Sequence, residues 1–89
     1  MNKNILIIGL GYVGTSLLLL LGKSNKVTVS DLDIQKLTNI SDGILSIDDS
    51  FAQEYLNNNN INISKINVNQ ITFQDYDFLI LSTPTNYDP

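Results

Sequence analysis

The chain has 89 residues, and nine acidic residues against five lysines and no arginine give it a net charge of −4. This length suits one domain or part of one, and the acidic balance argues against a nucleic-acid-binding surface, because no basic stripe is available to neutralise phosphates. The sequence contains neither cysteine nor histidine, so it offers no disulfide, thiolate metal site or cysteine nucleophile, and no metal site is expected.

The first predicted element is a strand that leads directly into a glycine-rich turn. Ile5 begins a run of four apolar residues, three of them β-branched, and glycines follow at positions 9, 11 and 14. In a dinucleotide-binding turn, Gly9 makes the sharp exit from the strand, Gly11 lets the backbone approach a pyrophosphate, and Gly14 lets the helix lie close on the sheet. N–H groups at the helix start would then face two phosphates. The alternative is that these are only turn and packing glycines of another α/β domain.

A helix is predicted to follow the turn, from Tyr12 to Leu21, and Gly22 ends it. Its run of five leucines is apolar on every side. Either this helix is buried on more than one face, or it has one buried leucine stripe and some exposed leucines. The long apolar stretch after Lys3 is similar to a signal peptide or a membrane span, but glycines and hydroxyl residues interrupt it and no small-residue cleavage site follows. We therefore expect a cytoplasmic protein with no membrane segment.

The second strand is predicted at Lys26 to Ser30, where β-branched residues alternate with others. It ends at Asp31, which lies about 20 residues after Gly11, the separation at which a dinucleotide-binding fold places an acid on the adenosine ribose. A carboxylate there accepts hydrogen bonds from the ribose hydroxyls and repels a 2′-phosphate, so the preferred cofactor would be NAD and not NADP. The alternative role for Asp31 is a helix N-cap, for which Asp33 competes.

Two helices are predicted between the second and third strands. The first spans residues 34–40, with apolar residues at 34, 37 and 40 and with Lys36 pointing away from them. Position alone favours Lys36 as a solvated surface residue. After a loop, residues 48–50 are expected to cap a second helix that continues to about residue 57. The large apolar residues expected on one side of it are Phe51, Tyr55 and Leu56.

The last third of the chain gives weaker patterns. A polar loop at 57–60 is expected to be exposed, and isoleucines at 61, 63 and 66 predict a third strand. A short helix of about two turns is predicted over 69–75, although its β-branched residues oppose helix formation. The run 78–81 is continuously apolar, which is typical of a strand that is covered on both faces.

These elements follow one another as strand, helix, strand, two helices, strand, short helix and strand. Right-handed crossovers then predict an α/β fold with a Rossmann-like parallel sheet in the order 3-2-1-4 and helices on both faces. The ligand crevice of such a sheet lies at the carboxyl ends of the first and fourth strands, where residues 9–14 meet residues 82–85. The sequence therefore predicts that the segment from Ser82 to Thr85 faces the phosphates and the nicotinamide side.

Four segments carry a likeness to a known family: residues 9–14, 27–31, 51–56 and 81–89. Together they resemble the amino-terminal part of the UDP-glucose 6-dehydrogenase family. The likeness covers nearly the whole chain, and its Thr-Pro-Thr-Asn-Tyr-Asp-Pro ending is more specific than the glycines. Leu45 and Ser46 depart from the Ser-Pro of many members, which puts the shape of that loop in doubt but not the NAD site.

The enzymes of this family oxidise the C6 alcohol of UDP-glucose twice, using two NAD molecules, to give UDP-glucuronate. The resemblance implies that residues 11–13 wrap the pyrophosphate of NAD, that Lys36 joins Asp31 at the adenosine ribose, and that two threonines line the cofactor pocket. With the glycines of the turn, the residues expected at the cofactor are Gly9, Gly11, Tyr12, Val13, Gly14, Asp31, Lys36, Thr83 and Thr85.

The catalytic part of the family has no counterpart in this chain. The resemblance implies that the catalytic cysteine, its lysine and aspartate partners and the UDP-sugar domain come after position 89, so no catalytic residue is expected here. We expect residues 1–89 to be the amino-terminal part of an NAD-binding domain that oxidises nothing by itself. Within the full-length enzyme, the implied partners are NAD, UDP-glucose and further copies of the same chain.

Two other functions stay open from the sequence. The chain would be either a stand-alone nucleotide-binding or interaction module, or the NAD-binding part of a dehydrogenase for a UDP-aminosugar or GDP-mannose. The Thr-Pro-Thr-Asn-Tyr ending favours UDP-glucose over these two sugars. We also expect the isolated chain to bind NAD weakly or not at all, since half of the pocket is missing. The unpaired edge of the strand at 78–82 and the leucine-rich helix predict self-association.

Overall fold

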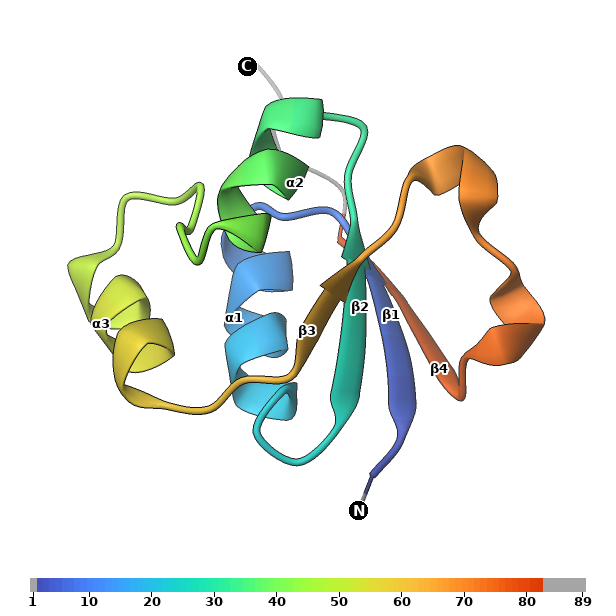
Figure 1. Cartoon of the computed structure of the whole chain (residues 1–89), viewed down its shortest axis with the longest axis horizontal. Helices are drawn as coiled ribbons and strands as arrows, with labels where there is room; N and C mark the ends of the chain where they lie inside the picture. The colour runs from blue at the N-terminus through green and yellow to red at the C-terminus, as the bar shows by residue number, and fades with distance from the viewer. Residues whose placement is uncertain (1, 83–89) are drawn as a thin grey trace, which may run out of the picture.

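The fold is organised around a sheet of four parallel strands in the order β3-β2-β1-β4 (Figure 1). This computed structural model describes residues 2–82. The strands are β1 (Asn4–Ile8), β2 (Lys26–Ser30), β3 (Ile63–Lys65) and β4 (Phe78–Leu81). The predicted strand order is confirmed, and the second strand has the predicted limits.

β1 lies in the middle of the sheet and pairs with β2 on one side and β4 on the other. Ile7, for example, is opposite Val29 of β2 and Ile80 of β4. The centre of β1 is buried, with Ile5, Leu6 and Ile7 at most 4% exposed. Burial on both faces explains why this strand reads as an unbroken apolar run. The glycine turn that follows is thus held by the central strand.

Three α-helices lie together on one side of the sheet (Figure 1). They are α1 (Tyr12–Leu21), α2 (Ile34–Ser41) and α3 (Ser50–Asn58). Leu18 of α1 and Leu37 of α2 share one apolar core with Val27 and Val29 of β2. This core fixes the starts of α1 and α2 above the carboxyl ends of the strands, because each helix begins just after a strand ends.

Burial along α1 decides between the two alternatives for its leucine run. Leu18 and Leu19 are buried, whereas Leu20 is 71% exposed. α1 therefore has one buried stripe and an exposed leucine, as an ordinary amphipathic helix does. Gly22 ends the helix as predicted, and its N–H donates to the Leu18 carbonyl oxygen at 2.8 Å.

Aspartates cap the two helices that follow β2. Asp33 accepts a hydrogen bond from the Gln35 N–H at 3.0 Å, and Asp49 accepts one from the Ala52 N–H at 3.0 Å. Each carboxylate thereby satisfies a backbone donor that the first turn of a helix leaves without a partner. The cap of α2 is Asp33, so the N-cap alternative for Asp31 is wrong.

The packed side of α3 is not the one that its large residues suggest. Phe51 is 84% exposed, whereas Ala52 and Leu56 pack against the core. Residues four apart lie on one helix face, so the inward pair 52 and 56 turns Phe51 toward solvent. The expectation that Phe51, Tyr55 and Leu56 lie on one side is therefore wrong for Leu56, because Phe51 and Tyr55 are exposed and Leu56 packs inward.

The connection between β3 and β4 does not contain the helix predicted over 69–75. Two 3₁₀ turns, η1 (Val68–Gln70) and η2 (Phe73–Asp75), occupy it instead. Ile71 between them is extended, with φ −74° and ψ 132°. β-branched side chains such as Ile71 and Thr72 lose rotamer freedom in a helix, which favours this break. The connection lies across the sheet from the three α-helices, so helical segments flank both faces (Figure 1).

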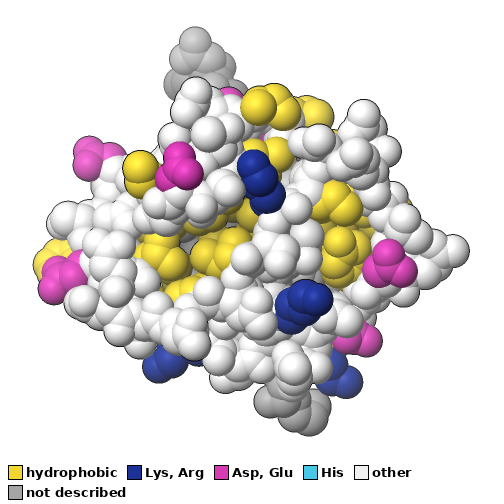
Figure 2. Space-filling model, in the orientation of Figure 1, with side chains coloured by type: hydrophobic (Ala, Val, Ile, Leu, Met, Phe, Trp, Pro, Cys, Tyr) yellow, Lys and Arg dark blue, Asp and Glu magenta, His cyan; other side chains and the backbone are white. Residues whose placement is uncertain are grey.

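β4 is more exposed than its sequence predicts. Phe78, Leu79 and Leu81 are 57%, 47% and 66% exposed. Figure 2 shows apolar side chains reaching the surface at several places on the viewed face. The expectation that this run is covered on both faces is wrong for these residues, because β4 is an edge strand of the described sheet. Within residues 2–82, none of the helices is both long enough and apolar enough to cross a bilayer.

Candidate functional site

The glycine turn lies where the carboxyl ends of three strands meet. Gly9 has a φ of +112°, in the region that favours glycine. Its N–H donates to the Ser30 carbonyl oxygen at 2.8 Å, and a Cβ atom at Gly9 would overlap the carbonyl oxygen of Ser82. Gly9 therefore turns the chain sharply between the ends of β2 and β4.

Gly14, in the first turn of α1, is in contact with the same turn. A Cβ atom at Gly14 would overlap the carbonyl oxygen of Gly9 and would lie 3.3 Å from the Cβ of Ser82. The sequence predicts that Gly14 brings the helix close to the sheet. The structure makes this more specific, because the close neighbour is the backbone of the turn itself.

Gly11 differs from these two glycines because the space beside its Cα is open. A Cβ atom at Gly11 would meet no atom within 4 Å. Its φ of −80° and ψ of −160° also suit any residue. The described fold therefore does not require glycine at this position. A phosphate that approaches the bare backbone would require it, because a side chain would occupy the same space.

The start of α1 presents backbone donors to this open space. Gly11 is the N-cap, and no side chain caps the helix. Within residues 2–82, the N–H groups of Tyr12 and Val13 have no acceptor, as expected for the first turn of a helix. Donors of this kind, with the positive end of the helix dipole behind them, attract an anion. The backbone of the turn can thus bind phosphates without a basic side chain.

Asp31 lies at the end of β2, beside the glycine turn. Its Oδ2 accepts a hydrogen bond from the Leu10 N–H at 2.7 Å, and its Oδ1 accepts one from the Asp33 N–H at 2.8 Å. A carboxylate has about four acceptor positions, so each oxygen retains capacity for a further donor. The structure therefore brings Asp31 and the glycine turn together, as their spacing predicts.

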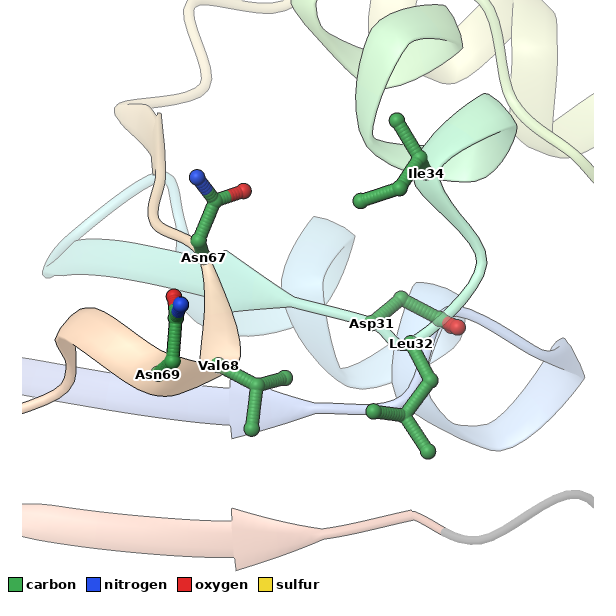
Figure 3. A pocket seen from close by; sticks show the side chains of 6 residues that line it. All are labelled: Asp31, Leu32, Ile34, Asn67, Val68 and Asn69. Atoms are coloured by element: carbon green, nitrogen blue, oxygen red, sulfur yellow. The ribbon is translucent and has the colours of Figure 1, made fainter.

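A cavity of about 400 Å³ opens beside Asp31, between the segments that follow β2 and β3 (Figure 3). Leu32 and Ile34 supply apolar surface from the β2 side, and Asn67 and Asn69 supply amides from the β3 side. The complete lining is Asp31, Leu32, Ile34, Asn67, Val68 and Asn69. A mostly apolar opening with a few polar groups is the kind of site that takes a small organic ligand.

Sequence reasoning missed residues 67–69, because their stretch carries no ligand-binding motif and its last residue, Asn69, lies within the region predicted as a helix. The available signal was the sheet order. Since β3 neighbours β2, the residues after β3 must lie beside those after Ser30, at the carboxyl edge where ligands bind.

The side chains of the other predicted site residues do not line this cavity in the described part of the chain. Lys36 is half-buried in the first turn of α2 and is not part of the cavity lining. The hydroxyl oxygen of Tyr12 accepts a hydrogen bond from the Asp48 N–H at 3.3 Å, so this side chain is engaged with the loop before α3. Thr83 and Thr85 lie outside the described residues.

The groups gathered here are suited to binding. They are the backbone N–H groups of the turn, one carboxylate, two amides and three apolar side chains. In the described part of the chain, no three histidine, cysteine or acidic side chains are grouped as metal ligands would be. The arrangement can hold and orient a ligand that has phosphates, a ribose and a base.

Known proteins contain a segment that is similar in sequence to this chain. Residues 3–89 match the model of the UDP-glucose/GDP-mannose dehydrogenase family, NAD binding domain. The chain is 34% identical over 84 residues to a UDP-glucose 6-dehydrogenase of Streptococcus pneumoniae, and 33% identical over 89 residues to one of Campylobacter jejuni. Each alignment covers 94% of this chain but only 21% and 22% of the relative, so the chain spans about a fifth of the length of these curated relatives.

Proposed function

This chain belongs to the UDP-glucose/GDP-mannose dehydrogenase family, whose NAD-binding domain it matches over residues 3–89, and from this premise we propose that the glycine turn and the Asp31 cavity form one NAD site. The observation that carries the proposal is Gly11, where the fold leaves open space and does not itself require glycine. The family resemblance found in the sequence and NAD as the cofactor are confirmed by the family match.

We place the pyrophosphate of NAD on the backbone between Gly11 and Val13. The N–H groups of Tyr12 and Val13 are without acceptors in the described residues and point out of the helix start. They would donate to phosphate oxygens, while the helix dipole stabilises the negative charge. Gly9 and Gly14 contribute indirectly, because their close packing fixes the shape of the turn.

We place the adenosine half in the cavity beside Asp31. The carboxylate has acceptor capacity for the ribose hydroxyls, and Leu32 and Val68 offer apolar surface to a base. A 2′-phosphate would meet the negative charge of Asp31, so NAD is preferred over NADP. Lys36, in the first turn of α2, is proposed at the ribose from the family likeness alone. Thr83 and Thr85 are proposed for the cofactor pocket from the family likeness alone.

We further propose that the natural protein that carries these residues oxidises UDP-glucose to UDP-glucuronate. Support comes from the two relatives, each named a UDP-glucose 6-dehydrogenase. When bound, NAD supplies the hydride acceptor. The role of residues 1–89 is to bind and orient it, and alone they are expected to form no NADH. The test is NADH formation with UDP-glucose, GDP-mannose and a UDP-aminosugar in turn; oxidation of only one of the latter two would overturn the assigned substrate.

The NAD site itself is tested by Gly11→Ala in the same natural protein. Because the backbone at Gly11 suits alanine and the added Cβ meets nothing, the melting temperature should stay the same or rise slightly. The Cβ would occupy the space that a phosphate needs, so the Kd for NAD should rise about tenfold or more, as measured by titration calorimetry.

Ser16→Ala is the matched control for this experiment, because it also places alanine near the start of α1 but on an exposed position outside the turn. It should change neither the melting temperature nor the Kd. An unchanged NAD affinity in Gly11→Ala would remove the glycine turn from the proposed site.

A further inference from the structure

Ser30, the last residue of β2, is fully buried and is bonded in two directions. Its carbonyl oxygen accepts the hydrogen bond from the Gly9 N–H, at the start of the glycine turn. Its hydroxyl donates to the Ile66 carbonyl oxygen at 2.7 Å. One residue therefore connects the turn to the chain that follows β3.

The bond to Ile66 lies at the point where the β2–β3 pairing ends. β3 ends at Lys65, and the Ile66 N–H still donates to the Val29 carbonyl oxygen at 3.0 Å. The Ser30 hydroxyl then holds the Ile66 carbonyl oxygen, so it extends the attachment beyond the regular ladder. The next residue, Asn67, already lines the cavity.

Beyond Ile66, the cavity segment 67–69 has no further bond to the sheet in the described part of the chain. Its hydrogen bonds are local: the Gln70 N–H donates to Asn67 and the Ile71 N–H donates to Val68. The side chain of Asn67 does not cap η1. The last hydrogen bond that fixes this segment against β2 is therefore the one from Ser30.

We infer that Ser30 is a positioning residue for the NAD site: by holding Ile66, its hydroxyl sets residues 67–69 opposite Asp31 and so sets the width of the adenosine cavity. This inference rests on the proposed function. Ser30 itself is fully buried and does not line the cavity, so it acts only through the segment that it holds.

The experiment compares Ser30→Ala with Thr28→Val in the natural protein that carries these residues. Thr28 lies two residues earlier on the same face of β2 and is nearly buried, but in the described residues its hydroxyl makes no hydrogen bond to the 66–69 segment. Both variants remove one hydroxyl from the same strand. Only Ser30→Ala removes the bond to Ile66.

Two measurements follow for each variant. Hydrogen exchange of the Gln70 and Ile71 amides, which donate the hydrogen bonds of this segment, should become faster without ligand in Ser30→Ala and stay unchanged in Thr28→Val. The Kd for NAD should rise about fivefold in Ser30→Ala, the factor that one net hydrogen bond contributes. The Kd for adenosine monophosphate should rise by the same factor as the Kd for NAD, whereas the Kd for nicotinamide mononucleotide should not change. A general loss of stability would raise the Kd for both mononucleotides.

The outcomes separate this inference from the proposed function. If Ser30→Ala leaves the affinity for NAD unchanged, or weakens the binding of both mononucleotides equally, Ser30 does not position the adenosine cavity. If the unaltered protein fails to bind NAD at all, the proposed function fails. Unchanged exchange of the Gln70 and Ile71 amides would in either case overturn the role of Ser30 as the anchor of this segment.

Discussion

The three glycines of the turn between β1 and α1 are needed for three different reasons. Gly9 needs its positive φ and its contact with Ser82, Gly14 needs room for the Gly9 carbonyl, and Gly11 lies beside open space. Only Gly11 therefore depends on a ligand for its explanation. Asp31 shows the reverse situation, because it already has partners: both of its oxygens accept backbone N–H groups in the absence of any ligand.

Asp31→Ala should weaken NAD binding by ~1 to 3 kcal/mol, the usual cost of losing a charged hydrogen-bond partner. It should also lower the free energy of unfolding, because the Leu10 N–H loses its acceptor. Calorimetry with NAD and urea unfolding measure the two effects. Asp33→Ala is the control, since it removes the cap of α2 and costs ~1 kcal/mol of stability but leaves the acceptor of Leu10 in place. Equal NAD affinity in both variants would contradict the assignment of Asp31.

At the scale of single elements, local signals decide where helices start and break. α3 begins at an aspartate cap, and the connection after β3 breaks at Ile71 and Thr72, where β-branched residues oppose helix. Which face of an element is buried depends on its neighbours instead. Ala52 faces the core while the larger Phe51 faces solvent, because the position of α3 against α1 sets its orientation.

The cap of α3 gives a prediction with a neighbouring control. Asp49→Ala should destabilise the protein by ~1 kcal/mol and speed hydrogen exchange at Ala52, because the N–H there loses its acceptor. Asp48→Ala should stay within ~0.5 kcal/mol of the unaltered protein, since only its backbone N–H is bonded in the described residues. Equal effects of the two substitutions in urea unfolding would show that the cap does not contribute.

At the scale of the whole molecule, parallel strands bring distant segments to one edge of the sheet. Residues 9–14, Asp31, residues 67–69 and Ser82 are far apart in sequence and converge at the carboxyl ends of the four strands. The same sheet exposes β4, an apolar edge strand within the described residues. An uncovered edge of this kind offers backbone and apolar side chains for pairing with another chain.

We therefore expect the 89-residue chain to self-associate in solution through β4. Leu81→Lys should shift it toward the monomer in sedimentation velocity, because a charge on an edge strand opposes edge pairing. Leu20→Lys, at a similarly exposed leucine of α1, should leave the association unchanged. A monomeric chain at all concentrations would contradict the expectation, and equal effects of the two lysines would assign the association to another surface.

The sequence by itself determined the limits of α1 and β2, the parallel order of the strands, and the meeting of Gly9, Gly11 and Asp31 at one edge. These follow from short-range periodicity, turn chemistry and the handedness of crossovers, which are properties of neighbouring residues. Only the tertiary structure decided that Leu20 is exposed, that Asp31 holds the Leu10 N–H, and that Ser30 anchors the segment before Asn67. These depend on contacts between segments far apart in the chain. How the helices and the β3–β4 connection pack on the sheet sets the burial of each side chain and the distances between the segments.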